Sequence, residues 1–269
     1  MNRNTMLIEA DELLSKMGNE NIRIFDATIT DDVYLQEHIP GAAYFDHEKY
    51  SDPDSKYEYT LLPGAALIEQ IGKVGISNDS EIIFYACGML PYAARAWWML
   101  RHAGHQNARV LNGGLSAWKK AGGTTEQESR QYEPSAFQGQ IRAGMFVSKE
   151  DVMEALKKDD VATINVMPIE SHEGMHITDS SNLSCMDLMQ GMDYFQPNEE
   201  LASRLKELAG YEHIITYCGG GIAATVNAMA HWILGQENVA VYDGSLYEWF
   251  GEGLPTTGNG RWEIWKQEA

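Results

Sequence analysis

The sequence is poor in basic residues, and no long apolar run occurs in it. Lys and Arg number 20 against 39 Asp and Glu, which gives a formal net charge of −19 over 269 residues. Nucleic acids and anionic membranes bind basic patches, so this charge argues against both as partners. No apolar stretch approaches the roughly 20 residues of a membrane helix. Acidic residues stand near the N-terminus, where a signal peptide would be apolar, and we therefore expect a cytoplasmic protein.

Cysteines are also few: Cys87, Cys185 and Cys218 cannot all pair with one another. No Cys-x-x-Cys motif or Cys/His cluster has the spacing of zinc ligands. We therefore expect neither a disulfide framework nor a metal site. A functional role for any of the three cysteines therefore has to be inferred from the residues that surround it in the sequence.

Cys218 stands between an expected strand and an expected helix. The apolar run 213–217 is typical of a buried strand, and 222–234 contains neither Pro nor Gly, as a helix requires. Three glycines follow the cysteine, and without Cβ atoms they let the backbone curl around an anion. The first amides of a helix carry partial positive charge, which stabilises a thiolate. Cys218 is thus a candidate nucleophile, although a buried structural cysteine or a phosphate-binding loop has a similar pattern.

Elsewhere the sequence predicts alternating strands and helices. The expected strands are 22–26, 81–86 and 110–111, and the expected helices are 65–74, 91–102 and 115–121. Such alternation is typical of an α/β fold with a mainly parallel sheet covered by helices on both faces.

The pattern is present twice. A shift of 131 residues places 83–118 on 214–249 without a gap, and ten of 36 positions are identical, where chance gives roughly two or three. Cys87 then falls on Cys218. We therefore predict an N-terminal domain over 1–123, a linker over 124–145 and a C-terminal domain over 146–269.

Several motifs occur in the order of one known family. They are the duplication itself, Glu-His-Ile-Pro-Gly-Ala at 37–42, Leu-Asn-Gly-Gly-Leu-Ser-Ala-Trp at 111–118, Cys-Gly-Gly-Gly-Ile-Ala at 218–223 and Tyr-Asp-Gly-Ser-Leu-Tyr-Glu-Trp at 242–249. In these the chain resembles the two-domain rhodanese family, the thiosulfate and 3-mercaptopyruvate sulfurtransferases. The resemblance implies two rhodanese-like domains, of which only the second is catalytic.

The resemblance also implies a reaction. Cys218 would take a sulfane sulfur from thiosulfate or 3-mercaptopyruvate as a persulfide and pass it to cyanide or a thiol, with no cofactor or metal. The implied substrate-binding residues are Gly219, Gly220, Gly221, Ile222, Ala223 and Ser245. Cys87 is a possible second thiol, but its loop is apolar and contains Pro91, which has no N–H to offer. Cys185 has no anion-binding context.

The chain departs from the family at its donor clamp. The family's second domain places arginines where this sequence has Met167 and Ser171. We therefore expect a weak response to thiosulfate, and we keep an alternative: a non-catalytic carrier, or one fed by a protein persulfide. A cysteine phosphatase needs an arginine six residues after its cysteine. Ala224 and Ala93 stand at those positions, which excludes that class.

Overall fold

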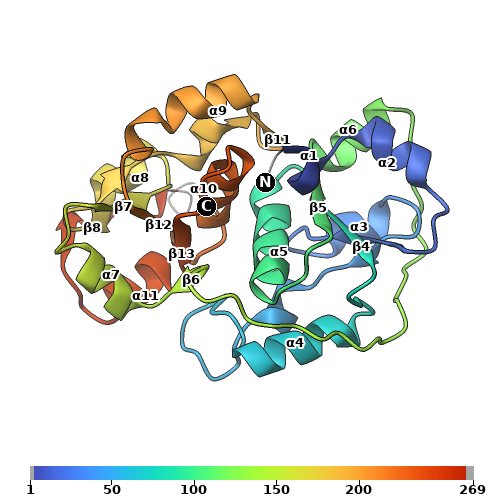
Figure 1. The fold of residues 1–269 in the computed structure, drawn as a ribbon, viewed down its shortest axis with the longest axis horizontal. Helices are drawn as coiled ribbons and strands as arrows, with labels where there is room; N and C mark the ends of the chain where they lie inside the picture. Colours follow the sequence, from blue (N-terminus) through green and yellow to red (C-terminus); the bar gives the residue numbers. More distant parts are fainter. Residues whose placement is uncertain (1–2, 265–269) are drawn as a thin grey trace. The chain divides into compact units, whose positions relative to one another are not determined.

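The computed structural model describes residues 3–264 and divides the chain into two compact units (Figure 1). Of the described residues, the first unit holds 3–53, 61–143 and 190–195. The second unit holds 54–60, 144–189 and 196–264. Each unit thus includes a short segment from the other side of the chain's midpoint.

The first unit is built on a five-stranded parallel sheet in the order β1-β5-β4-β2-β3. Its strands are β1 (Leu7–Ile8), β2 (Ile22–Asp26), β3 (Ala43–Tyr44), β4 (Glu81–Tyr85) and β5 (Ala108–Leu111). Its helices are α1 (Arg3–Met6), α2 (Ala10–Lys16), α3 (Asp32–Gln36), α4 (Gly64–Lys73), α5 (Leu90–His102) and α6 (Gly114–Lys120), with a 3-10 turn η1 (His47–Tyr50).

The second unit repeats this strand order as β6-β13-β12-β7-β9, again all parallel. Its strands are β6 (Phe146–Val147), β7 (Val161–Asn165), β9 (Ser181–Asn182), β12 (His213–Tyr217) and β13 (Val239–Tyr242). Its helices are α7 (Lys149–Ala155), α8 (Ile169–Gly174), α9 (Asn198–Arg204), α10 (Ala224–Ile233) and α11 (Ser245–Gly251), with 3-10 turns η2 (Cys185–Leu188) and η3 (Lys206–Leu208).

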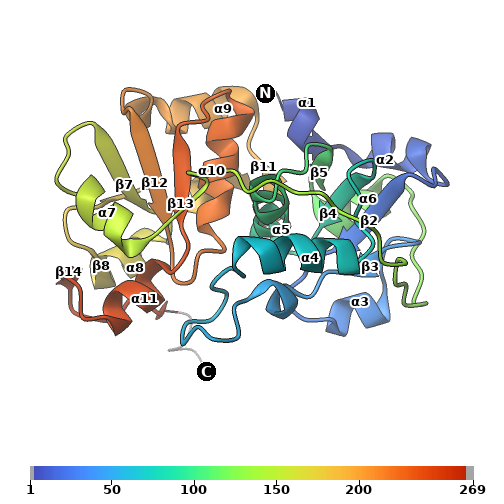
Figure 2. The ribbon, with the colours of Figure 1, turned by 60° about the horizontal axis from the view of Figure 1, so that its bottom comes forward.

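Two small two-stranded sheets complete the fold. One joins β10 (Met189–Gln190) to β11 (Tyr194–Phe195), and the other pairs β8 (Met175–Ile177) with β14 (Thr256–Gly258) in antiparallel fashion. Helices lie on both faces of each five-stranded sheet (Figures 1 and 2). The predicted α/β fold of two parallel-sheet domains is confirmed.

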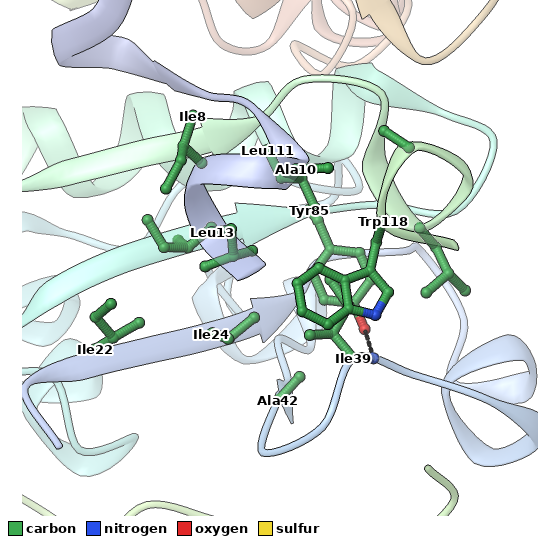
Figure 3. Packing of buried hydrophobic residues seen from close by; sticks show 13 residues of the cluster. Ile8, Ala10, Leu13, Ile22, Ile24, Ile39, Ala42, Tyr85, Leu111 and Trp118 are labelled. Atoms are coloured by element: carbon green, nitrogen blue, oxygen red, sulfur yellow. Dashed lines mark hydrogen bonds between the residues drawn. The ribbon is translucent and has the colours of Figure 1, made fainter. Parts of the chain in front are cut away.

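The core of the first unit follows from its apolar strands. Tyr85, Trp118 and Ile39 gather there with ten other buried residues, as Figure 3 shows. The Tyr85 hydroxyl accepts the backbone N–H of Ile39 at 3.2 Å, so the buried amide of that turn has a partner. Central strands buried on both faces explain why these segments read as continuous apolar runs.

The expected linker lies along the first unit up to residue 143. Its Glu126 exchanges two backbone hydrogen bonds with His38, and the Tyr132 hydroxyl donates to the Gly41 carbonyl at 2.8 Å. The predicted domains 1–123 and 146–269 are each one continuous stretch of sequence, whereas each unit also includes a short segment from elsewhere in the chain. The domain boundaries stay a prediction. None of the helices within residues 3–264 is long and apolar enough to cross a membrane.

Asp26, at the end of β2, generates a prediction on stability. Its carboxylate is fully buried, and Oδ1 accepts the Thr28 N–H at 3.0 Å. Burial raises the pKa of Asp26, and the hydrogen bonds from Thr28 and Tyr85 only partly oppose this. A carboxyl whose folded pKa lies above its unfolded pKa destabilises the fold as pH rises through that range.

We therefore expect Asp26→Asn to be more stable than the wild type at pH 7, on the order of 1 kcal/mol. The gain should shrink as pH falls toward 3, because the wild-type carboxyl is then neutral as well. Urea unfolding at both pH values measures this, with the exposed Asp159→Asn as control. A gain that is the same at both pH values would rule out ionisation as its cause.

Candidate active site

Cys218 lies at the carboxyl end of β12, the central strand of the second unit. β12 ends at Tyr217, the loop 218–223 follows, and α10 begins at Ala224. This is the strand–loop–helix order that the sequence predicts. Ligands of open parallel sheets bind at the carboxyl ends of the strands, so the loop has the expected position for a site. The Cys218 side chain is 4% exposed.

The first turn of α11 holds the Cys218 backbone in place. The Cys218 N–H donates to the Ser245 hydroxyl oxygen at 3.1 Å, and that hydroxyl donates to the Tyr242 carbonyl at 2.7 Å. The Cys218 carbonyl accepts from the Leu246 N–H at 3.0 Å, and the Gly219 carbonyl accepts from the Tyr247 N–H at 2.9 Å. The cysteine is therefore fixed on both sides of its α-carbon.

The three glycines of the loop are explained by close approach. Gly221 has φ +78°, and a Cβ there would lie 2.5 Å from the Asp243 carbonyl oxygen. At Gly219 a Cβ would lie 3.0 Å from the Trp262 ring, and at Gly220 it would lie 3.2 Å from the Tyr247 ring. Side chains at these positions would push the loop away from its supports.

Ile222 and Ala223 complete the loop and start the helix. Both are partly buried. Their carbonyls accept the N–H groups of Thr225 and Val226 at 3.1 and 3.0 Å. Gly219, Gly220, Gly221, Ile222 and Ala223 thus form one continuous turn beside Cys218.

The strand registers show which residue of the first unit corresponds to Cys218. Asp26 and Asn165 end β2 and β7, and in each a side-chain oxygen accepts the N–H two residues further on. Asp26 pairs with Tyr85 on the neighbouring strand, and Asn165 pairs with Tyr217. The two tyrosines are therefore equivalent, and both hydroxyls accept a backbone N–H from a turn of their own unit.

Ala86, the residue after Tyr85, therefore takes the place of Cys218. The gapless repeat alignment, which places Cys87 there, is wrong by one residue in this stretch. The contact at Gly114 agrees, because a Cβ on Gly114 would collide with the Ala86 carbonyl, whereas the corresponding Ser245 bonds Cys218.

In the first unit, Met192 and Asp193 are hydrogen-bonded to the residues that correspond to the site of the second unit. Leu90 donates its N–H to the Met192 carbonyl at 2.8 Å, and Gly113 donates to the Asp193 carbonyl at 2.9 Å. Burial raises the pKa of the Asp193 carboxyl, which hydrogen bonds from Ser116 and the Gly88 N–H oppose. An internal carboxylate thus uses an amide that an anionic ligand would need.

The other two cysteines have surroundings unfavourable to a thiolate. Burial raises the pKa of Cys87, and the nearby carboxylates of Asp26 and Asp193 add to the effect. Burial, followed by the charge of Cys218, raises the pKa of Cys185 to about 12. Both thiols are therefore protonated at neutral pH.

Substrate binding by Ser245 stays a prediction, and the structure shows what its side chain contacts. Its side chain is fully buried, and its hydroxyl makes the two hydrogen bonds described above. Its φ is +49°, a left-handed conformation that is strained for a serine, and glycine stands at the corresponding Gly114 with φ +52°. Ser245 thus positions Cys218.

The two residues at the positions of the family's donor-clamp arginines are both buried. Met167 is 4% exposed and Ser171 is fully buried. No group of three or more His, Cys, Asp or Glu in the described part of the chain is arranged to hold a metal ion. Sequence reasoning also missed Glu58, Tyr247 and Trp262, whose contacts with the loop follow from folding and not from a motif.

A family model described as the rhodanese-like domain matches residues 9–121 and 148–252. This chain belongs to the rhodanese family. Its relatives include a thiosulfate sulfurtransferase of Bos taurus, 32% identical over 240 residues, which covers 83% of this chain and 81% of that protein. A 3-mercaptopyruvate sulfurtransferase of Homo sapiens is 28% identical over 265 residues, with 93% and 86% covered.

Among solved structures, the rhodanese fold of SseA from Escherichia coli, described as a 3-mercaptopyruvate sulfotransferase, aligns with a TM-score of 0.79. It is 28% identical, and the match covers 90% of this chain and 98% of that one. These relatives confirm the predicted two-domain rhodanese family and the predicted sulfurtransferase activity. They do not favour the alternative of a non-catalytic carrier.

Two variants of Ser245 test whether its backbone is strained and whether its hydroxyl holds Cys218 in place. Ser245→Ala removes the acceptor of the Cys218 N–H and keeps a Cβ at positive φ. Ser245→Gly removes the same acceptor but relieves the strain, which is about 1 kcal/mol for a left-handed residue. We expect Ser245→Gly to unfold at higher urea than Ser245→Ala. Both should lower kcat about tenfold with a smaller change in KM.

The two variants separate strain from hydrogen bonding. Equal unfolding free energies would show that the backbone at 245 is not strained. Wild-type kcat in both would show that Ser245 does not position the nucleophile.

Proposed function

We propose that Cys218 is the nucleophile of this sulfurtransferase and carries the transferred sulfur as a persulfide. The observation that carries the proposal is the support of Cys218 by a strained Ser245, where glycine would suffice for the fold. Strain of this kind persists where the surrounding structure imposes it, and it gathers at functional sites.

The first half-reaction loads the enzyme. The Cys218 thiolate attacks the outer sulfur of the donor, a sulfur–sulfur bond forms at Sγ, and the bond between that sulfur and the rest of the donor breaks. With thiosulfate, sulfite leaves with the electron pair of the broken bond. The amides of residues 219–223 then stabilise the persulfide anion.

The second half-reaction returns the enzyme to its starting state. A thiophilic acceptor, cyanide or a thiol, takes the outer sulfur, and the Cys218 thiolate leaves. The covalent intermediate separates the two halves and predicts ping-pong kinetics. Every group that this cycle uses belongs to the chain or to a substrate.

The donor stays open between thiosulfate, 3-mercaptopyruvate and a protein persulfide. Met167 and Ser171 offer no positive charge to an anionic donor, so thiosulfate should load the enzyme poorly. A cytoplasmic location is part of the same proposal and rests on the sequence alone.

Intact-protein mass after incubation with thiosulfate or 3-mercaptopyruvate tests the nucleophile. We expect the wild type to gain the mass of one sulfur atom and Cys218→Ser to gain none, because no other cysteine has the supported loop. Cys87→Ser and Cys185→Ser are the matched controls and should gain as the wild type does.

Two other results of the mass measurement would change the assigned nucleophile or the assigned donor. A gain that survives in Cys218→Ser but disappears in Cys87→Ser would move the site to the first unit. No gain with either small donor, together with a gain from a protein persulfide, would identify the third donor.

A further inference from the structure

A cavity of about 320 Å³ adjoins the Cys218 loop within the second unit. It is lined by Lys56, Tyr57, Glu58 and Tyr247. Two of the lining residues border the loop, since a Cβ on Gly220 would lie 3.2 Å from the Tyr247 ring and 3.8 Å from the Glu58 carbonyl oxygen. A molecule in this cavity would therefore lie beside the residues that follow the nucleophile.

Each of the two tyrosines in the wall donates its hydroxyl proton to a carboxylate. Tyr57 donates to Glu252 at 2.7 Å, and Tyr247 donates to Glu263 at 2.9 Å. A phenol that donates to a carboxylate becomes richer in electrons, which strengthens the attraction of its ring face for a cation.

The site is electronegative around Tyr247. Burial and the hydrogen bond to Glu263 raise the pKa of Tyr247 far above its usual range, and the charges of Glu58 and Cys218 add to the effect. Trp262 supports this wall, with its ring centroid 5.0 Å from that of Tyr247 in an edge-on arrangement. Aromatic faces and carboxylates together form the usual surroundings of a bound ammonium group.

The cation in the wall, Lys56, is already neutralised. Its ammonium group lies 3.0 Å from the Glu252 carboxylate and 5.5 Å from the centroid of the Tyr57 ring. The charge of Glu58, a further lining residue, acts on Tyr247 in the same wall. Lys56 also shows that an ammonium group fits against this pairing of ring and carboxylate.

We propose that this cavity binds the positively charged end of the sulfur acceptor, a small thiol that carries an ammonium or quaternary ammonium group. The inference rests on the proposed function, because the acceptor takes its sulfur from the Cys218 persulfide. The acceptor thiolate attacks the outer sulfur of the protonated persulfide, and a new sulfur–sulfur bond forms. The bond to Sγ breaks, and Cys218 leaves as a thiolate with the electron pair.

The test isolates the acceptor step in a single turnover. The enzyme is loaded with inorganic polysulfide, freed of excess reagent, and its loss of one sulfur is followed by intact mass. Three thiols are compared at equal thiolate concentration: thiocholine, which is cationic, 2-mercaptoethanol, which is neutral, and mercaptoacetate, which is anionic. We expect thiocholine to react about tenfold faster than 2-mercaptoethanol, and mercaptoacetate to react most slowly.

Variants link the preference to the cavity. Glu58→Gln and Glu263→Gln should each reduce the thiocholine-to-mercaptoacetate ratio several-fold, and Lys56→Met should raise it. Glu199→Gln removes the same charge from an exposed position on α9 and should leave the ratio unchanged.

The possible outcomes separate the inference of a cationic acceptor from the proposed Cys218 persulfide on which it rests. A loaded enzyme that reacts equally with all three thiols, or fastest with mercaptoacetate, overturns the cationic acceptor and leaves the Cys218 persulfide standing. Equal loss of the ratio in Glu199→Gln assigns the preference to overall charge and also overturns it. An enzyme that polysulfide cannot load overturns the proposed function and this inference with it.

Discussion

The hydrogen bond from the Cys218 amide to the Ser245 hydroxyl joins the two loops on which the site depends. One loop follows β12 and the other precedes α11, and they are neighbours because β12 and β13 are parallel. Ser245 makes this hydrogen bond with its backbone in the left-handed region, at φ +49°. The glycines of the Cys218 loop then follow as a requirement, since Gly221 must pass close to the Asp243 carbonyl.

The two units show how one fold can carry different chemistry. Both have the same strand order, the same tyrosine accepting a buried amide, and a turn at a left-handed residue. The first unit has Ala86 where the second has Cys218, and it fills the adjoining loop with Met192 and Asp193. The two units thus share the scaffold but differ in the residue at this position.

Much of this could be predicted from the sequence, because parallel strands buried on both faces produce continuous apolar runs. For that reason the sequence alone predicted the strand before Cys218, the glycine loop and the helix that follows it. The gapless alignment paired Cys87 with Cys218 wrongly by one residue. The correct correspondence depends on how the strands pair, and a gapless alignment contains no information on strand pairing. Burial of Ser245 and the approach of Tyr247 and Trp262 to the loop depend on long-range packing, which local patterns do not encode.

The segment 54–60 belongs to the second unit, although it lies in the chain between β3 and α4 of the first. Cys218 and part of the cavity wall are therefore carried by stretches of sequence some 160 residues apart, as Glu58 and Cys218 are. Insertions or substitutions in this surface segment can change which molecules reach the sulfur without altering the loop that holds it. A gene fragment that encoded only 144–269 would carry Cys218 but leave behind Lys56, Tyr57 and Glu58 of the cavity wall. The proposed selectivity and the proposed reactivity of this rhodanese are therefore encoded by separate stretches of sequence.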